Sequence, residues 1–263
     1  MAPPVDTSLS VSVEGPVGRI MLGTPGAIHA VDEPFGRALA AAVERLAGDA
    51  RVRAVVLESQ ARVFCAGVRL DLVPELADPE VAAALLESLN AGVLALAELP
   101  KPTVAAVAGA AYGGGHNLAL ACDLTIASPA ASFCQAFAGI GLATDVGSLY
   151  LLTRRVGTHR AKELALTGRA LSAEAALALG AVDEVVAEEE LEPRCAELAG
   201  ELAARAPLAM GAIKEGFARS AAMGFEESLE LEMELQARQF ASADFQEGAR
   251  AFLAKRPPRY EGR

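Results

Sequence analysis

The feature that most constrains this chain is a run of 21 residues without a charged side chain, 102–122, which reads PTVAAVAGAAYGGGHNLALAC. A run of this length could span a bilayer. It opens with Pro102, however, and its second half holds Gly113-Gly114-Gly115 followed by His116 and Asn117. This order predicts a buried strand, a glycine turn and a buried helix inside a folded domain.

The rest of the chain alternates short apolar strands with helices. Residues 8–22 predict a hairpin around Gly15-Pro16, and residues 32–49 have apolar side chains at helical spacing after an acidic start. Further strands are expected at 52–59, 102–107, 123–128 and 131–135, with a helix at 79–99. Beyond residue 146 the pattern is almost entirely helical and ends in a long helical segment over 225–254. Apolar strand runs of this kind are typical of covered parallel sheets, so we expect an α/β fold.

Composition excludes several classes of protein. The chain has 263 residues and a net charge of −11, which disfavours nucleic acid as a partner because phosphates would be repelled. Its cysteines and histidines lack metal-ligand spacing, so neither a metal site nor a disulfide framework is expected. The N-terminus has no basic start and no apolar run, which speaks against a signal peptide. We expect a soluble cytoplasmic protein with no membrane partner.

Two glycine-centred loops each follow an apolar strand, at 62–71 (RVFCAGVRLD) and 109–120 (GAAYGGGHNLAL). Glycine permits positive φ angles and a close approach of the backbone to a ligand. A chain that turns through glycine into a helix leaves its first N–H groups unpaired at the positive end of the helix dipole. Two such loops that converge could bind one oxyanion from two sides.

These motifs, together with FCQAFAGIGLATDVGSLYLLTRRVG, AKELALTGRALSAEAALALGAVDEVV and the tail DFQEGARAFLAKRPPRYEGR, resemble the crotonase superfamily of enoyl-CoA hydratases and isomerases over nearly the whole chain. The resemblance implies a spiral of ββα units over residues 1–200 and a C-terminal helical oligomerisation region over 201–263, in a homotrimer or a dimer of trimers. It also implies an acyl-CoA substrate, with coenzyme A entering as part of the substrate and no permanently bound cofactor. The backbone amides of Val68 and Gly114 would hold the thioester oxygen of an enolate.

The chain departs from the hydratases that it resembles at two positions. Those enzymes carry glutamates where this chain has Asn117 and Phe137, so hydration by the usual two-carboxylate route is not expected. The pattern is closest to the single-aspartate isomerase branch, which implies Asp145 as the acid/base. Asp145 could instead be the N-cap of the following helix. Apolar neighbours such as Phe137, Ile140 and Leu142 should raise its pKa, which suits a base.

Further site residues follow from the same resemblance. Asn117 either orients the substrate or satisfies buried backbone groups, and Phe137 is either a pocket wall or a core side chain. Leu70 is expected in the substrate pocket, and residues 72–98 are expected to line the acyl side. Coenzyme A is expected near Ala27, His29, Ala30, Ala66, Val68, Lys255 and Tyr260, the last two reaching a neighbouring subunit's cofactor.

Other functions remain compatible with the sequence. Asp145 could act as a nucleophile, in a thioester hydrolase or in a dehalogenase-like member, although the dehalogenase branch has a histidine near the position of Asn90. A non-catalytic acyl-CoA binder that has lost both glutamates is also compatible. The apolar side chains along 225–254 could pack on their own domain or on a sister subunit; they are Leu229, Met233, Phe240, Phe245 and Phe252.

Overall fold

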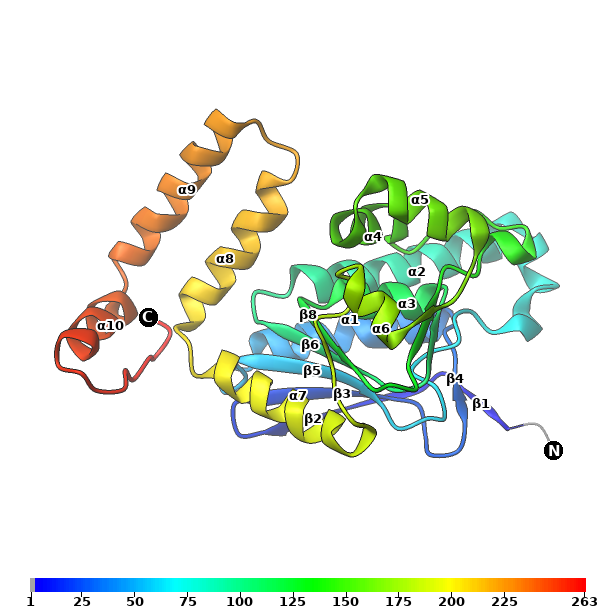
Figure 1. The fold of residues 1–263 in the computed structure, drawn as a ribbon, viewed down its shortest axis with the longest axis horizontal. Helices are drawn as coiled ribbons and strands as arrows, with labels where there is room; N and C mark the ends of the chain where they lie inside the picture. The colour runs from blue at the N-terminus through cyan, green and yellow to red at the C-terminus, as the bar shows by residue number, and fades with distance from the viewer. Residues whose placement is uncertain (1–2) are drawn as a thin grey trace.

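The computed structural model describes residues 3–263, and a six-stranded sheet forms its centre (Figure 1). The strand order is β11-β8-β6-β5-β3-β2, in which β2 and β3 form the expected antiparallel hairpin and all other neighbours are parallel. The strands are β2 (Leu9–Glu14), β3 (Val17–Leu22), β5 (Ala54–Ser59), β6 (Thr103–Val107), β8 (Leu124–Ala127) and β11 (Glu184–Val185).

A second layer of short strands runs beside this sheet. A three-stranded sheet has the order β10-β9-β7, and β1 pairs with β4 in parallel. These strands are β1 (Val5–Asp6), β4 (Ile28–His29), β7 (Ala110–Tyr112), β9 (Ser132–Cys134) and β10 (Leu171–Ser172). Successive turns of the chain each place one strand in the large sheet and a following segment in the second layer. The fold is therefore the expected α/β spiral of ββα units with helices at its C-terminus.

Ten α-helices complete the described part of the chain. They are α1 (Glu33–Gly48), α2 (Pro79–Glu98), α3 (Gly114–Ala121), α4 (Ser148–Val156), α5 (Thr158–Thr167), α6 (Ala173–Ala178), α7 (Glu188–Ala203), α8 (Pro207–Ser220), α9 (Phe225–Phe240) and α10 (Ala243–Leu253). Short 3₁₀ turns lie at Leu70–Leu72, Glu75–Ala77 and Ala138–Ile140. The expected strand and helix of 102–122 appear as β6 and α3, and the chain turns at Gly113, but the short strand β7 between them was not expected.

The core divides between the two faces of the large sheet. Val55 and Leu57 of β5 pack with α1, α2 and α3, whereas Ala54 and Val56 point to the opposite face and pack against α7. Both faces of the parallel strands are thus covered by helices (Figure 1), which explains why the strand segments are continuously apolar. Within the described residues, α2 alone is long and apolar enough to cross a membrane, yet one of its sides is buried against α1.

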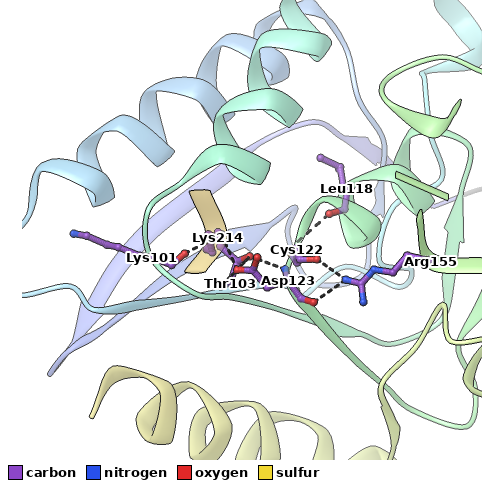
Figure 2. A network of polar contacts seen from close by, with 7 residues as sticks. All are labelled: Lys101, Thr103, Leu118, Cys122, Asp123, Arg155 and Lys214. Carbon is purple, nitrogen blue, oxygen red and sulfur yellow. Dashed lines mark hydrogen bonds and ion pairs between the residues drawn. The ribbon is translucent and has the colours of Figure 1, made fainter. Parts of the chain in front are cut away.

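Helices α8, α9 and α10 extend from the core as an arm (Figure 1). A polar junction ties α8 to the sheet (Figure 2): Lys214 Nζ donates to the Asp123 carboxylate at 2.6 Å, and Thr103 Oγ1 donates to the same carboxylate at 2.9 Å. From α4, Arg155 donates to the carbonyl oxygens of Cys122 and Asp123, both at 2.7 Å. Residues 122–123, between α3 and β8, are therefore bonded to both α4 and α8.

The helical segment expected over 225–254 is interrupted. Ser242 ends the run, because its hydroxyl accepts a hydrogen bond from the Phe245 amide at 3.0 Å and caps α10. The five apolar side chains named above for this segment lie open to solvent in the single chain, with Met233 71% and Phe252 83% exposed, whereas Leu231 and Leu235 of α9 are buried. Those five side chains are therefore not covered by their own domain.

Candidate active site

The two glycine loops of the sequence lie against each other. Cys65 joins the second strand layer, since its amide donates to Ala110 at 3.0 Å and its carbonyl accepts from Tyr112 at 2.9 Å. A Cβ atom on Gly67 would lie 3.8 Å from the amide nitrogen of Gly114. The loop that carries Val68 thus meets the first residue of α3.

Glycine is required at two points of this contact. Gly67 has a φ of +89°, and a Cβ there would lie 3.0 Å from the Tyr112 carbonyl oxygen. Gly115 is tighter still, because its Cβ would lie 2.2 Å from the Cys65 carbonyl oxygen. The close approach of the two loops therefore depends on the absence of side chains at both positions.

The amide groups of Val68 and Gly114 are available as donors. Within residues 3–263, neither amide donates a hydrogen bond to another backbone or side-chain group, although Gly67 and Arg69 on either side of Val68 are bonded to Val31. Gly114 is the first residue of α3, so its N–H lies at the positive end of the helix dipole. Two unpaired donors on adjacent loops can stabilise one oxyanion.

Asp145 lies in the loop between the 3₁₀ turn at Ala138–Ile140 and α4. Its Oδ1 atom is buried without a hydrogen-bond partner in the described part of the chain. Burial raises the pKa of this carboxyl group to about 6, partly offset by a hydrogen bond within its own residue. The expected direction is confirmed, but Ile140 and Leu142 are themselves 61% and 51% exposed and contribute less shielding than expected.

Asp145 is not the N-cap of α4. That position belongs to Gly147, and no side chain caps the first turn. Asp145 instead accepts through its backbone: its carbonyl oxygen receives the Ser148 amide at 3.0 Å and the Asn117 side-chain amide at 2.9 Å. The carboxyl group is left without a structural role in helix capping.

Asn117 satisfies a buried backbone group, which is one of the two alternatives expected for this residue. It is fully buried, its Nδ2 donates to the Asp145 carbonyl, and its Oδ1 accepts from Gln135 at 3.0 Å. Asn117 lies three residues after Gly114 on the first turn of α3, so this contact ties the Asp145 loop to the helix that begins at Gly114. Both polar atoms of its side chain have a partner within the protein.

The two expected pocket residues differ in exposure. The Phe137 ring lies against the glycine turn, 3.6 Å from the place a Cβ of Gly113 would occupy, and is 7% exposed. Leu70 is 69% exposed, on the short turn that follows Val68. Phe137 is therefore buried against the glycine turn at Gly113, whereas Leu70 is open to solvent on the Val68 side.

Several of the residues expected to bind coenzyme A lie beside the loop that carries Val68. The backbone of 27–31 lies beside 66–69, with the Ala66 amide donating to the His29 carbonyl at 2.8 Å and the Arg62 amide donating to that of Ala27 at 2.8 Å. The His29 ring itself is fully buried, both of its nitrogens lack partners among residues 3–263, and burial lowers its pKa to about 4. His29 can therefore meet a ligand through its backbone and not through its ring. The Ala30 amide donates to Asp6 and is already occupied.

Comparison of the whole chain with known proteins shows its family. Residues 13–263 match the model of the family described as enoyl-CoA hydratase/isomerase. The chain belongs to this family, within the crotonase superfamily.

Relatives along the full length of the chain have different activities in their names. The chain is 35% identical to the 1,2-epoxyphenylacetyl-CoA isomerase of Escherichia coli, with 95% of this chain and 97% of that protein covered. It is 34% identical to the trans-2-decenoyl-[acyl-carrier-protein] isomerase of Streptococcus mutans, with 96% and 97% covered. The crystal structure of an enoyl-CoA hydratase from Polaromonas sp. JS666 matches with a TM-score of 0.91 at 32% identity, covering 96% and 99% of the two chains.

Lys255 and Tyr260, which are expected to contact a neighbouring subunit's coenzyme A, lie far from the site of their own chain. Lys255 and Tyr260 follow α10, and the arm lies at the opposite end of the molecule from β4 (Figure 1). The Tyr260 carbonyl accepts from Arg53 at 2.8 Å, which ties the tail to its own sheet. Arg69, beside the site, is paired with Asp71 at 2.5 Å.

Sequence reasoning missed Gln135. Its side chain is 1% exposed and bonds Asn117, His116 and Ser148. A buried glutamine directly after a strand that precedes the Asp145 loop was the available signal, because a buried amide needs partners. Within residues 3–263, no group of three or more His, Cys, Asp or Glu side chains is placed to hold a metal ion.

Proposed function

We propose that this member of the family is an acyl-CoA isomerase that moves a double bond, or rearranges a ring, through a thioester enolate. The observation that carries the proposal is the half-buried Asp145 carboxyl group, whose Oδ1 is buried without a partner among the described residues and whose pKa is raised to about 6. Such a group is poised both to accept and to return a proton near neutral pH.

The proposed reaction uses three groups of the chain. The Asp145 carboxylate removes a proton from the substrate carbon, and the electron pair moves towards the thioester carbonyl to give an enolate. The amides of Val68 and Gly114 stabilise the oxyanion, at roughly 3 kcal/mol for a single donor. The protonated Asp145 then returns the proton to a different carbon, so no water and no redox partner is consumed.

The surroundings of Asp145 favour isomerisation over hydration. Adding water across a double bond by the family's two-glutamate route needs a second carboxylate. At the two positions concerned the chain has Phe137, which is apolar, and Asn117, whose side-chain atoms are bonded to Asp145 and Gln135. One group that takes and returns the same proton suits a reaction without water.

Incubation with a panel of straight-chain, branched and aromatic unsaturated acyl-CoA esters in D₂O tests the proposal. We expect a shifted double bond with little deuterium in the product, because Asp145 returns the substrate's own proton, and the loss of the shift in Asp145→Asn with acyl-CoA binding retained. Equal turnover by Asp145→Asn would overturn the proposal. So would a hydrated product, a covalent adduct on Asp145, or tight binding without any turnover.

We further propose that the enzyme works in the cytoplasm as a homotrimer or a dimer of trimers, without nucleic-acid or membrane partners. The arm supports this assembly, because α8, α9 and α10 line an apolar groove of about 1030 Å³ that the chain leaves open. Lys255 and Tyr260 would then reach the coenzyme A of a neighbouring subunit. Light scattering of the purified protein checks this, and a monomer at micromolar concentration would contradict it.

A further inference from the structure

A cluster of buried polar side chains lies behind Asp145. His116, Asn117, Gln135 and Ser148 are 1%, 0%, 1% and 2% exposed. They come from α3, from the end of β9 and from the start of α4, so the cluster joins three parts of the fold. Polar groups this deep need partners, and nearly all of theirs lie within the cluster.

Gln135 closes a ring of hydrogen bonds around the Asp145 backbone. Its Nε2 donates to Asn117 Oδ1 at 3.0 Å, and its Oε1 accepts from Ser148 Oγ at 2.8 Å. The same two partners hold the Asp145 carbonyl oxygen, Asn117 through Nδ2 at 2.9 Å and Ser148 through its amide at 3.0 Å. One side chain thus bridges both donors that fix the position of Asp145.

The segment held in this way has an unfavourable backbone conformation. Val146 has a φ of +47°, which a β-branched residue rarely adopts, and Gly147 follows with +82°. Such a conformation persists only where the surrounding structure enforces it, and it occurs preferentially at functional sites. The hydrogen-bonded ring supplies that constraint directly before Val146.

Asn117 fixes the direction of the Gln135 amide. Because Asn117 Nδ2 donates to the Asp145 carbonyl, its Oδ1 faces Gln135 and accepts from Nε2 at 3.0 Å. Turning the amide over would place Gln135 Oε1 against the Asn117 Oδ1 acceptor. Oε1 is therefore directed to Ser148, and His116 Nδ1, 3.0 Å from Gln135 Nε2, accepts in the tautomer that carries its proton on Nε2.

We propose that Gln135 is a positioning residue that keeps the Asp145 carboxyl group in its half-buried, reactive place by holding Asn117 and Ser148. The inference rests on the proposed function, because it assumes that Asp145 moves the proton. Gln135 touches no substrate in this account and acts only through its neighbours.

The substitution Gln135→Met tests this, since it keeps the length of the side chain and removes every hydrogen bond. The matched control is Thr103→Val, which removes hydrogen bonds of a fully buried side chain in the junction of Figure 2, outside the cluster. Two readouts are needed: kcat and KM with an accepted acyl-CoA, and a ¹³C NMR titration of the Asp145 carboxyl, assigned by its loss in Asp145→Asn.

We expect Gln135→Met to lower kcat by on the order of 100-fold while KM changes little, because a small displacement of the reacting group is enough. The pKa of Asp145 should fall from about 6 towards 3.8 as water reaches the carboxyl. Thr103→Val should lower only the stability. If Gln135→Met does not fold, Ser148→Ala removes one hydrogen bond of the ring and should shift the same two quantities less far.

An unchanged pKa and kcat in a folded Gln135→Met, with a loss of stability like that of the control, would overturn the inference. The two proposals fail separately. If the wild-type protein converts no thioester but the substitution still moves the pKa, the proposed function is wrong and the positioning role stands. If the wild-type protein is an isomerase and Gln135→Met leaves the pKa of Asp145 unchanged, the proposed function stands and the positioning role is wrong.

Discussion

Replacing Asp145 with asparagine should make the protein more stable at alkaline pH while it removes the proposed base. In the folded protein the pKa of this carboxyl is raised from 3.8 to about 6 by burial. Between these two pH values the folded state keeps a proton that the unfolded state releases, so the free energy of unfolding falls as the pH rises from about 4 to about 6. Above that window the loss is complete and constant.

The size of this effect follows from the shift. Two pKa units correspond to about 3 kcal/mol, and solvent contact of the partly exposed carboxyl reduces the loss to roughly 1–2 kcal/mol. Asparagine carries no charge, so Asp145→Asn should gain that amount at pH 8 and about half of it at pH 5. For a chain of this size the gain at pH 8 is a rise of a few degrees in Tm.

Urea unfolding followed by circular dichroism at both pH values measures the difference. Asp123→Asn is the matched control with the opposite sign, because the Asp123 carboxylate accepts from Lys214 at 2.6 Å and its removal should destabilise the protein at pH 8. The reasoning would be refuted if Asp145→Asn were less stable than the wild-type protein at pH 8, or if its gain were the same at pH 5.

Three further predictions follow from the same contacts. The kcat/KM of isomerisation should rise with pH through about 6, because only the ionised Asp145 accepts a proton; a flat pH–rate profile between pH 5 and 8 would contradict this. Gly115→Ala should abolish folding or cost about 3 kcal/mol or more in urea unfolding, since its Cβ would lie 2.2 Å from the Cys65 carbonyl oxygen, and unchanged stability would refute the loop contact. Lys214→Met should cost about 1–3 kcal/mol in the same assay, because the Asp123 carboxylate loses a charged partner, and an unchanged midpoint would count against the junction of Figure 2.

The fold and the two loops could be predicted because their signals are local. The uncharged run broken by three glycines predicted a strand, a turn and a helix, and the helix expected over 32–49 appears as α1, with Asp32 as its N-cap. The approach of Gly67 and Gly115 to the opposite loop follows the same logic, since glycine marks places where a side chain would collide.

The supports of Asp145 could not be predicted, because they depend on distance in space. Gln135 lies 18 residues from Asn117 and 13 from Ser148, and no pattern along the chain joins the three. The N-cap alternative for Asp145 failed for a related reason: the backbone turns through positive φ at Val146 and Gly147, which moves the start of α4 past the reach of that side chain. The break between α9 and α10 was also not predicted. It depends on a single side chain, because the Ser242 hydroxyl caps the start of α10.

The most direct test of the account is a crystal structure of Asp145→Asn with an unsaturated acyl-CoA bound. We predict that the thioester oxygen lies within about 3 Å of the amide nitrogens of both Val68 and Gly114, with the side chain of residue 145 facing the carbon that loses its proton. A thioester oxygen bound elsewhere, or a side chain at residue 145 turned away from the acyl group, would contradict it.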